Sequence, residues 1–200
     1  MYIMSSQERI FYVCSYGGSG SKMLCKYLDH FGKTIHVHSR NPPDKLKHVG
    51  GGCVYEEWFN SEDVDEETLK RCCVIYIYRD PIYAIYSRFH LMAHIHNVQL
   101  TRCIYLDQVV QEKKDLYLIE EFFDNWTTPR ERNYPIYCAK YENFFENIAE
   151  FNRAIGIPDK PELYPVEKCE YRNRPHESVL KEIYDPLVKK MEQMEFIRII

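Results

Sequence analysis

The sequence predicts an α/β protein built as a three-layer sandwich, with a central, mostly parallel sheet flanked by helices. Two observations lead to this prediction. Short apolar runs alternate along the chain with segments whose apolar residues recur at helical spacing. Several apolar runs, residues 73–78 above all, contain no polar alternation, which is typical of strands buried on both faces of a parallel sheet.

Each element in the N-terminal half is predicted from a local pattern. Strands are expected at residues 11–14, 34–38 and 73–78, where apolar residues run together or alternate. A helix should follow the first strand, because residues 23, 24, 27, 28 and 31 form one apolar stripe, and Gly32 is a natural residue to end it. Residues 41–52, rich in proline and glycine, are expected to form a loop. Residues 61–71 should be a helix, with acidic residues early and basic residues late.

The C-terminal half continues this alternation. A helix is expected to begin at Pro81, because proline fits the first turn of a helix. Residues 106–126 are predicted to be a long helical region, and residues 135–140 the last clear strand. The next helix should end at Gly156, and the final helix, over residues 180–191, is expected to kink at Pro186.

Length and composition favour a single domain that covers residues 1–200. The net charge of −4 argues against a general nucleic-acid surface. The N-terminus lacks a basic segment followed by an apolar core, and no run of 18 apolar residues exists, so we expect no signal peptide, no membrane span and a cytoplasmic protein. Of the eight cysteines, Cys14, Cys73 and Cys138 lie in apolar runs and Cys25 in a predicted helix, and no CxxC pair occurs, so reduced thiols are expected.

The most informative motif is Tyr16-Gly17-Gly18-Ser19-Gly20-Ser21-Lys22, which joins the first predicted strand to the first predicted helix. Glycines let successive backbone N–H groups point inward, and the N-terminus of a helix adds partial positive charge. The motif therefore predicts a binding site for a phosphate-bearing ligand. The alternative is a turn that only connects two elements.

This loop departs from the Walker A pattern, in which glycine stands six residues before a lysine that Ser or Thr follows. Here Tyr16 stands six residues before Lys22, and Met23 follows it. The hydroxyl that would hold magnesium is missing. We therefore expect the loop to bind an anion without an obligatory metal ion.

A second motif, Arg79-Asp80-Pro81 with Ser87 on the following helix, comes directly after a predicted buried strand. Arginine presents a forked donor for phosphate, and serine adds a hydroxyl. In open α/β sheets ligands bind beyond the carboxyl ends of the strands, where this motif and the glycine loop both stand. The motif predicts a second anion site. The alternative is a surface arginine and an ordinary helix serine.

In these motifs the chain resembles the sulfotransferases that use 3′-phosphoadenosine 5′-phosphosulfate (PAPS). Their first motif is a strand, a Tyr-Pro-Lys-Ser-Gly-Thr turn and a helix, and residues 16–21 match it at Tyr, Ser and Gly, with a serine hydroxyl last. Their second motif is a strand, Arg-Asp-Pro and a later serine, which Arg79 to Ser87 match. The segments 134–144 and 154–158 resemble two further stretches of the family. The resemblance implies a P-loop-NTPase-like fold over about residues 10–160.

The resemblance also implies roles for individual residues. Backbone N–H groups of Gly18 to Lys22, with the Ser19 and Ser21 hydroxyls, would hold the 5′-phosphosulfate. Arg79 and Ser87 would hold the 3′-phosphate, and Tyr141 would lie near the adenine. The set of residues expected to bind PAPS is Gly18, Ser19, Gly20, Ser21, Lys22, Met23, Arg79, Ser87, Tyr141, Arg172 and Arg174. Arg172 and Arg174 form a late basic segment that matches the family poorly, and an exposed basic loop is the alternative for them.

One departure from the family concerns catalysis. The family has lysine at the position of Gly18, where it bridges to the leaving phosphate and the transferred sulfuryl group. Lys22 is the candidate to reach in from the helix instead. The alternatives are that Lys22 only binds phosphate or points into solvent, in which case the protein would bind the nucleotide without transferring anything.

The cytosolic branch of the family places a catalytic histidine after the strand between the two motifs. His36 and His38 occupy this segment and share a face of the predicted strand, and His38, nearer its carboxyl end, is the favoured base. The alternative for His38 is a packed or solvated side chain. Other branches use a carboxylate, for which Glu56, Glu57 and Asp63 are candidates.

The sequence thus predicts sulfuryl transfer from PAPS, with the desulfonated nucleotide PAP as product and no metal. The acceptor is a hydroxyl or amine of a small molecule, a carbohydrate or a peptide. Two other functions fit the same residues: a nucleotide-dependent kinase of the same architecture, and a non-catalytic module that binds PAP or another nucleotide. The absent metal hydroxyl after Lys22 counts against the kinase, and the absent loop lysine keeps the module open.

Overall fold

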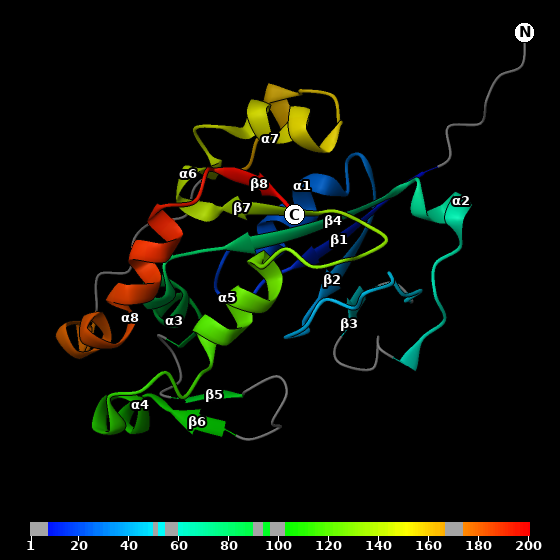
Figure 1. The fold of residues 1–200 in the computed structure, drawn as a ribbon. Coiled ribbons are helices and arrows are strands. Elements are labelled where there is room, and N and C mark those ends of the chain that lie inside the picture. Colours follow the sequence, from blue (N-terminus) through cyan, green and yellow to red (C-terminus); the bar gives the residue numbers. More distant parts are fainter. Residues whose placement is uncertain (1–7, 50–51, 55–59, 90–93, 97–102, 167–173) are drawn as a thin grey trace, which may run out of the picture.

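The computed structural model describes residues 8–49, 52–54, 60–89, 94–96, 103–166 and 174–200 (Figure 1). Their centre is a sheet of six strands in the order β3-β2-β1-β4-β7-β8. Five strands are parallel: β1 (Arg9–Cys14), β2 (Gly32–Val37), β3 (Gly52–Val54), β4 (Cys72–Tyr78) and β7 (Ile136–Lys140). The edge strand β8 (Ile197–Ile199) runs antiparallel to β7. The predicted α/β class with a mostly parallel central sheet is therefore confirmed.

Helices cover both faces of this sheet (Figure 1). One layer consists of α1 (Ser21–Leu28), α6 (Tyr141–Phe144) and α7 (Ile148–Ile155). The opposite layer consists of α3 (Pro81–Phe89), α4 (Leu106–Glu112), α5 (Ile119–Thr127) and α8 (Glu177–Glu192). The short helix α2 (Glu66–Leu69) precedes β4, a single 3₁₀ turn spans Pro161–Leu163, and β5 (His94–His96) and β6 (Cys103–Tyr105) form a separate antiparallel pair.

The central strands are buried on both sides, as their continuous apolar runs predict. In β4, Ile75 and Ile77 face the core under α1 and α7, whereas Tyr76 and Tyr78 face the core under α5 and α8. All four side chains are at most 2% exposed. The ring of Tyr76 stacks on Trp126 of α5 with centroids 5.6 Å apart. The two-sided burial fixes β4 rigidly, and with it the position of the residues that follow the strand.

Several predicted elements are shorter or differently bounded than expected. The helix predicted at residues 61–71 is limited to α2, whose N-cap is Asp65. The region 106–126 is divided into α4 and α5, because Lys113 and Leu118 adopt left-handed backbone conformations. Left-handed residues cannot continue an α-helix, so the apolar spacing over this region belongs to two helices that pack on the same core.

Gly32 was predicted to end the first helix, and this is wrong. The helix ends at Leu28 with Asp29 as its C-cap, and Gly32 is the first residue of β2. A Cβ atom on Gly32 would lie 2.4 Å from the carbonyl oxygen of Arg9 in the neighbouring strand. The glycine therefore allows β1 and β2 to approach each other. Gly156, by contrast, is the predicted left-handed C-cap of α7.

Strands β3 and β8 were not predicted, and Gly52, assigned to a loop, begins β3. Both are edge strands of three residues, too short to show a period in sequence. Within the described part of the chain, no helix has the length and hydrophobicity needed to cross a membrane. Among the cysteines in the described part of the chain, Cys14, Cys25, Cys72, Cys73 and Cys138 form no disulfide bond.

The strand order places a topological switch point between β1 and β4. From β1 the chain adds β2 and β3 on one side of the sheet, then crosses over and adds β4 and β7 on the other. Ligands in open α/β sheets bind beyond the carboxyl ends of the two strands at such a point. The glycine loop follows β1, and Arg79 follows β4, so both predicted motifs stand there.

Candidate functional site

The glycine loop after β1 has a backbone that only glycine adopts readily. Gly17, Gly18 and Gly20 have φ angles of +111°, +71° and +86°, and Gly20 is the N-cap of α1. The loop also lies close to its neighbours. A Cβ atom on Gly18 would be 2.3 Å from the carbonyl oxygen of Ala84 in α3. Both conformation and space therefore exclude a side chain at this position.

The loop and the first turn of α1 present a run of backbone donors. Among the described residues, no acceptor bonds the backbone N–H groups of residues 18–23. The first N–H groups of any α-helix lack intrahelical partners, and here the glycine loop extends the series. Such a run of N–H groups at a helix N-terminus, with the partial positive charge of the helix, is suited to bind a phosphate or sulfate group.

A chain of hydroxyl groups lies under the loop. The backbone N–H of Gly17 donates to Ser15 Oγ over 3.2 Å, and Ser15 Oγ donates to Ser21 Oγ over 2.9 Å. Ser21 Oγ in turn lies 2.8 Å from Nε2 of His36 on β2. All three side chains are at most 8% exposed. The loop is therefore connected to β2 through buried hydrogen bonds.

His36 and His38 lie together beside the loop, with ring centroids 4.0 Å apart. Burial above all, together with the positive charges of Lys22 and Arg88, lowers the pKa of His36 to about 4 and that of His38 to about 3, and the neighbouring His36 ring also lowers the pKa of His38. Both rings are therefore neutral at pH 7, so each has a lone pair that can accept a proton.

Lys22 and Met23 stand in the first turn of α1, and Lys22 is exposed. Both residues line a cavity of about 370 Å³ on the outer side of α1. The other described lining residues are Lys26, Tyr27, His30, Leu163, Pro165 and Val166. The cavity lies at the edge of the loop, is lined by both apolar and cationic groups, and is large enough for a small ligand.

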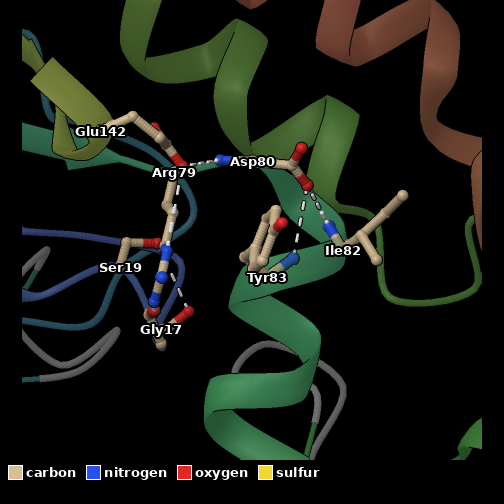
Figure 2. Close-up of polar contacts among 8 residues, drawn as sticks. Gly17, Ser19, Arg79, Asp80, Ile82, Tyr83 and Glu142 are labelled. Carbon is tan, nitrogen blue, oxygen red and sulfur yellow. Dashed lines mark hydrogen bonds and ion pairs between the residues drawn. The ribbon is translucent and has the colours of Figure 1, made fainter. Parts of the chain in front are cut away.

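Arg79 leaves the end of β4 and extends to the glycine loop, as Figure 2 shows. Its Nη1 donates to the carbonyl oxygen of Gly18 over 3.4 Å, and its Nε lies 3.8 Å from Oε1 of Glu142. This Nε is buried and forms no hydrogen bond. The side chain is 13% exposed and is thus held between the loop and Glu142 rather than extended into solvent. The two predicted anion motifs are in direct contact.

Asp80 and Pro81 explain the rest of this motif. The Asp80 carboxylate accepts hydrogen bonds from the backbone N–H groups of Ile82 and Tyr83 over 2.8 and 3.3 Å, so it caps α3 (Figure 2). Pro81 is the first residue of that helix. The backbone N–H of Asp80 donates to Glu142 Oε1 over 3.0 Å. The Arg-Asp-Pro sequence therefore directs the arginine toward the loop and begins the helix that carries Ser87.

Aromatic rings surround the Arg79 guanidinium. Its Cζ lies 4.4 Å from the ring centroid of Tyr141 and 5.5 Å from that of Tyr83. The Tyr83 ring also faces Arg174, whose Cζ is 4.8 Å from its centroid. The structure therefore brings Arg174 to the same side chain as Arg79. Tyr141 is 5% exposed and also lies against the loop, since a Cβ on Gly20 would be 2.4 Å from its ring.

The remaining predicted residues divide into three groups. Ser87 is half-buried on α3, and Ser19 is buried in the loop with its hydroxyl directed to the Gly17 carbonyl oxygen 3.5 Å away. Arg172, Glu56 and Glu57 lie outside the described residues. Asp63, the third candidate carboxylate, forms ion pairs with Lys45 and Lys47.

Sequence reasoning missed two side chains of the site, Arg88 and Tyr83, and gave no role to a third, Glu142, although it lies in the segment 134–144 that resembles the family. Arg88 lies four residues beyond Ala84 on α3, on the helix face that packs against the loop. The helix predicted after the Arg79 motif could therefore have indicated Arg88, because residues four apart share one face of a helix. The contacts of Glu142 could not be predicted locally, because its partners are 62 and 63 residues away in sequence. Among the described residues no group of three His, Cys, Asp or Glu side chains is placed to hold a metal ion, and metal independence stays a prediction.

Comparison of the chain with models of known protein families, with curated proteins and with solved structures finds no match. The function is therefore inferred from the site itself. Its defining features are a glycine loop with unbonded N–H groups, an arginine that contacts this loop, and a neutral histidine pair beside two cations.

Proposed function

We propose that the protein binds PAPS and transfers its sulfuryl group to a hydroxyl or amine acceptor, on a P-loop-NTPase-like fold. The observation that carries this proposal is the 3.4 Å contact of Arg79 Nη1 with the Gly18 carbonyl oxygen at the switch point between β1 and β4. PAPS carries anionic groups on its 3′ and 5′ oxygens, and this contact joins the two motifs that would bind them. A site for a single phosphate would not need both the glycine loop and the Arg79 motif.

The described residues fit the parts of such a ligand. The backbone N–H groups of residues 18–23 would hold the 5′-phosphosulfate, which is the part of PAPS that carries the transferable sulfuryl group. The guanidinium groups of Arg79 and Arg174, both close to the Tyr83 ring, would hold the 3′-phosphate together with Ser87. The cavity beside Met23 has apolar surface for the nucleoside.

The chemistry needs a group to take the acceptor proton and groups to stabilise the leaving oxygen. The acceptor oxygen or nitrogen forms a bond to sulfur while the bond from sulfur to the bridging phosphate oxygen breaks, and the negative charge passes to the 5′-phosphate. The loop N–H groups stabilise this charge. Neutral His38 accepts the proton. An anion next to Lys22 and Arg88 opposes their charges, which raises the pKa of His38 toward the range in which it is an effective base.

The test is calorimetric titration of the protein with PAP, ATP and GTP, each with and without Mg²⁺. We expect tight binding of PAP that is independent of Mg²⁺, because the contacts proposed are all from the protein. Binding of ATP that depends on Mg²⁺, with no binding of PAP, would reject the proposal in favour of a kinase. Failure of all three nucleotides to bind would reject any nucleotide site here.

One observation favours a second function, a non-catalytic module that binds PAP. The PAPS-dependent sulfotransferases have a lysine at the position of Gly18, where the backbone of this chain leaves no space for a side chain, and Lys22 is exposed. The discriminating measurement is turnover of PAPS with a panel of phenol, carbohydrate, amine and tyrosine-peptide acceptors. Product formation supports the enzyme, whereas tight PAP binding without product from any acceptor supports the module.

A further inference from the structure

Arg88, on the last turn of α3, lies directly over the glycine loop. A Cβ atom placed on Gly17 would be 1.9 Å from Nη1 of Arg88 and 3.0 Å from its Cζ. The guanidinium therefore occupies the position that a side chain at residue 17 would take. Gly18, with its φ of +71° and its contact with Ala84, is likewise closed to any side chain. The two glycines thus make room for α3 and for an arginine that reaches the loop from outside it.

The charge of Arg88 acts on the same space as that of Lys22. Arg88 on α3 and Lys22 on α1 both lower the pKa of His36 and of His38. Burial also lowers both pKa values, and the neighbouring His36 ring lowers that of His38. Two cations, neutral histidines and a run of unbonded N–H groups therefore converge on the loop, and an anion is the group that such a space binds.

We infer that Arg88 supplies the cation of the anion site in the glycine loop, in place of the side chain that Gly18 cannot carry. The inference takes the identity of its ligand, the phosphosulfate of PAPS, from the proposed function. The site itself would recognise any compact anhydride of phosphate or sulfate. Arg88 is better suited than Lys22, because its planar guanidinium offers several donors in a fixed geometry and it is half-buried, whereas Lys22 is exposed.

The experiment measures binding of inorganic pyrophosphate to the wild-type protein and to Arg88→Gln, Arg88→Lys and Arg153→Gln, by calorimetry without Mg²⁺. Arg153 is an exposed arginine on α7 and serves as the matched control for removal of one positive charge. We expect Arg88→Gln to bind roughly tenfold or more weakly, as for loss of one charge-assisted contact. Arg88→Lys should recover part of the loss, and Arg153→Gln should bind as the wild type does.

A second measurement distinguishes a local effect from damage to the fold. The pKa values of His36 and His38, followed by NMR, should rise in Arg88→Gln, because a cation that lowers them has been removed. Unchanged histidine pKa values, unchanged pyrophosphate affinity in Arg88→Gln, or no binding of pyrophosphate to the wild type would each overturn the inference. PAP is titrated in parallel: pyrophosphate binding that depends on Arg88, without PAP binding, would retain the Arg88 site and reject the nucleotide.

Discussion

The two ends of the candidate site are built in opposite ways. At the Arg79 end, the guanidinium is already surrounded: Glu142 lies beside it, and the rings of Tyr141 and Tyr83 face it. At the loop end, the backbone N–H groups of residues 18–23 have no acceptor among the described residues, and the charges that act on the histidines are those of Lys22 and Arg88.

This difference suggests separate roles for the two ends, one in positioning the ligand and the other in the affinity for its anionic group. Contacts with Glu142 and two rings fix the geometry of Arg79 before a ligand arrives, but they also neutralise part of its charge. The loop end is the better suited to bind an anion, because the backbone N–H groups of residues 18–23 have no acceptor among the described residues and two cations act on the histidines beside them. We therefore expect the loop end to contribute most to anion affinity and the Arg79 end to determine which nucleotide binds.

Acid should destabilise the loop end strongly. His36 and His38 titrate at about 4 and about 3 in the folded protein and near 6.5 when unfolded, so below pH 6.5 the unfolded chain binds more protons and the free energy of unfolding falls as the pH falls. By pH 5 the loss is about 2 kcal/mol for each histidine. Urea unfolding of the wild type and of His36→Gln/His38→Gln between about pH 7.5 and 5 measures it. The double variant should lose most of the slope, and an equal slope in both proteins would contradict the assignment.

Replacement of Arg79 by alanine should weaken PAP binding by roughly 2–4 kcal/mol, because a buried, charge-assisted contact is lost. Calorimetry with PAP and with adenosine 5′-phosphate sharpens the comparison of the two ends. The variant should lose affinity for PAP and little for the 5′-phosphate alone, since Arg79 is assigned to the 3′-phosphate. An equal loss for both ligands would show that Arg79 serves the loop instead.

The smallest expected effect compares two glycines with nearly equal backbone angles. Gly18 and Gly156 have φ angles of +71° and +69°, but a Cβ on Gly18 would lie 2.3 Å from a backbone oxygen, whereas on Gly156 its nearest neighbour is a side-chain nitrogen 3.6 Å away. Gly156→Ala should cost about 1 kcal/mol of unfolding free energy from strain alone. Gly18→Ala should cost roughly 1–3 kcal/mol more, because the loop must move away from α3. Equal costs in urea unfolding would mean that the loop is not confined.

Much of the fold was predictable because its central strands depend on local composition. Residues 73–78 are apolar throughout, and a segment with no polar face must be covered on both sides, which is what the two cores around β4 provide. The edges were not predictable in this way. Strands β3 and β8 have three residues each, and pairing with β2 and β7, rather than their own sequence, makes them strands.

The candidate site likewise has features that depend on local sequence and features that depend on tertiary contacts. The sequence by itself determined the loop and the Arg79 motif, because glycines at left-handed positions, and a proline and an aspartate at a helix start, act on the backbone within a few residues of themselves. Only the tertiary structure decided that Arg88 covers Gly17, that His36 contacts Ser21, and that Glu142 and Tyr141 enclose Arg79. These contacts join separate elements of the fold, and their existence depends on packing distances that no local pattern of residues encodes.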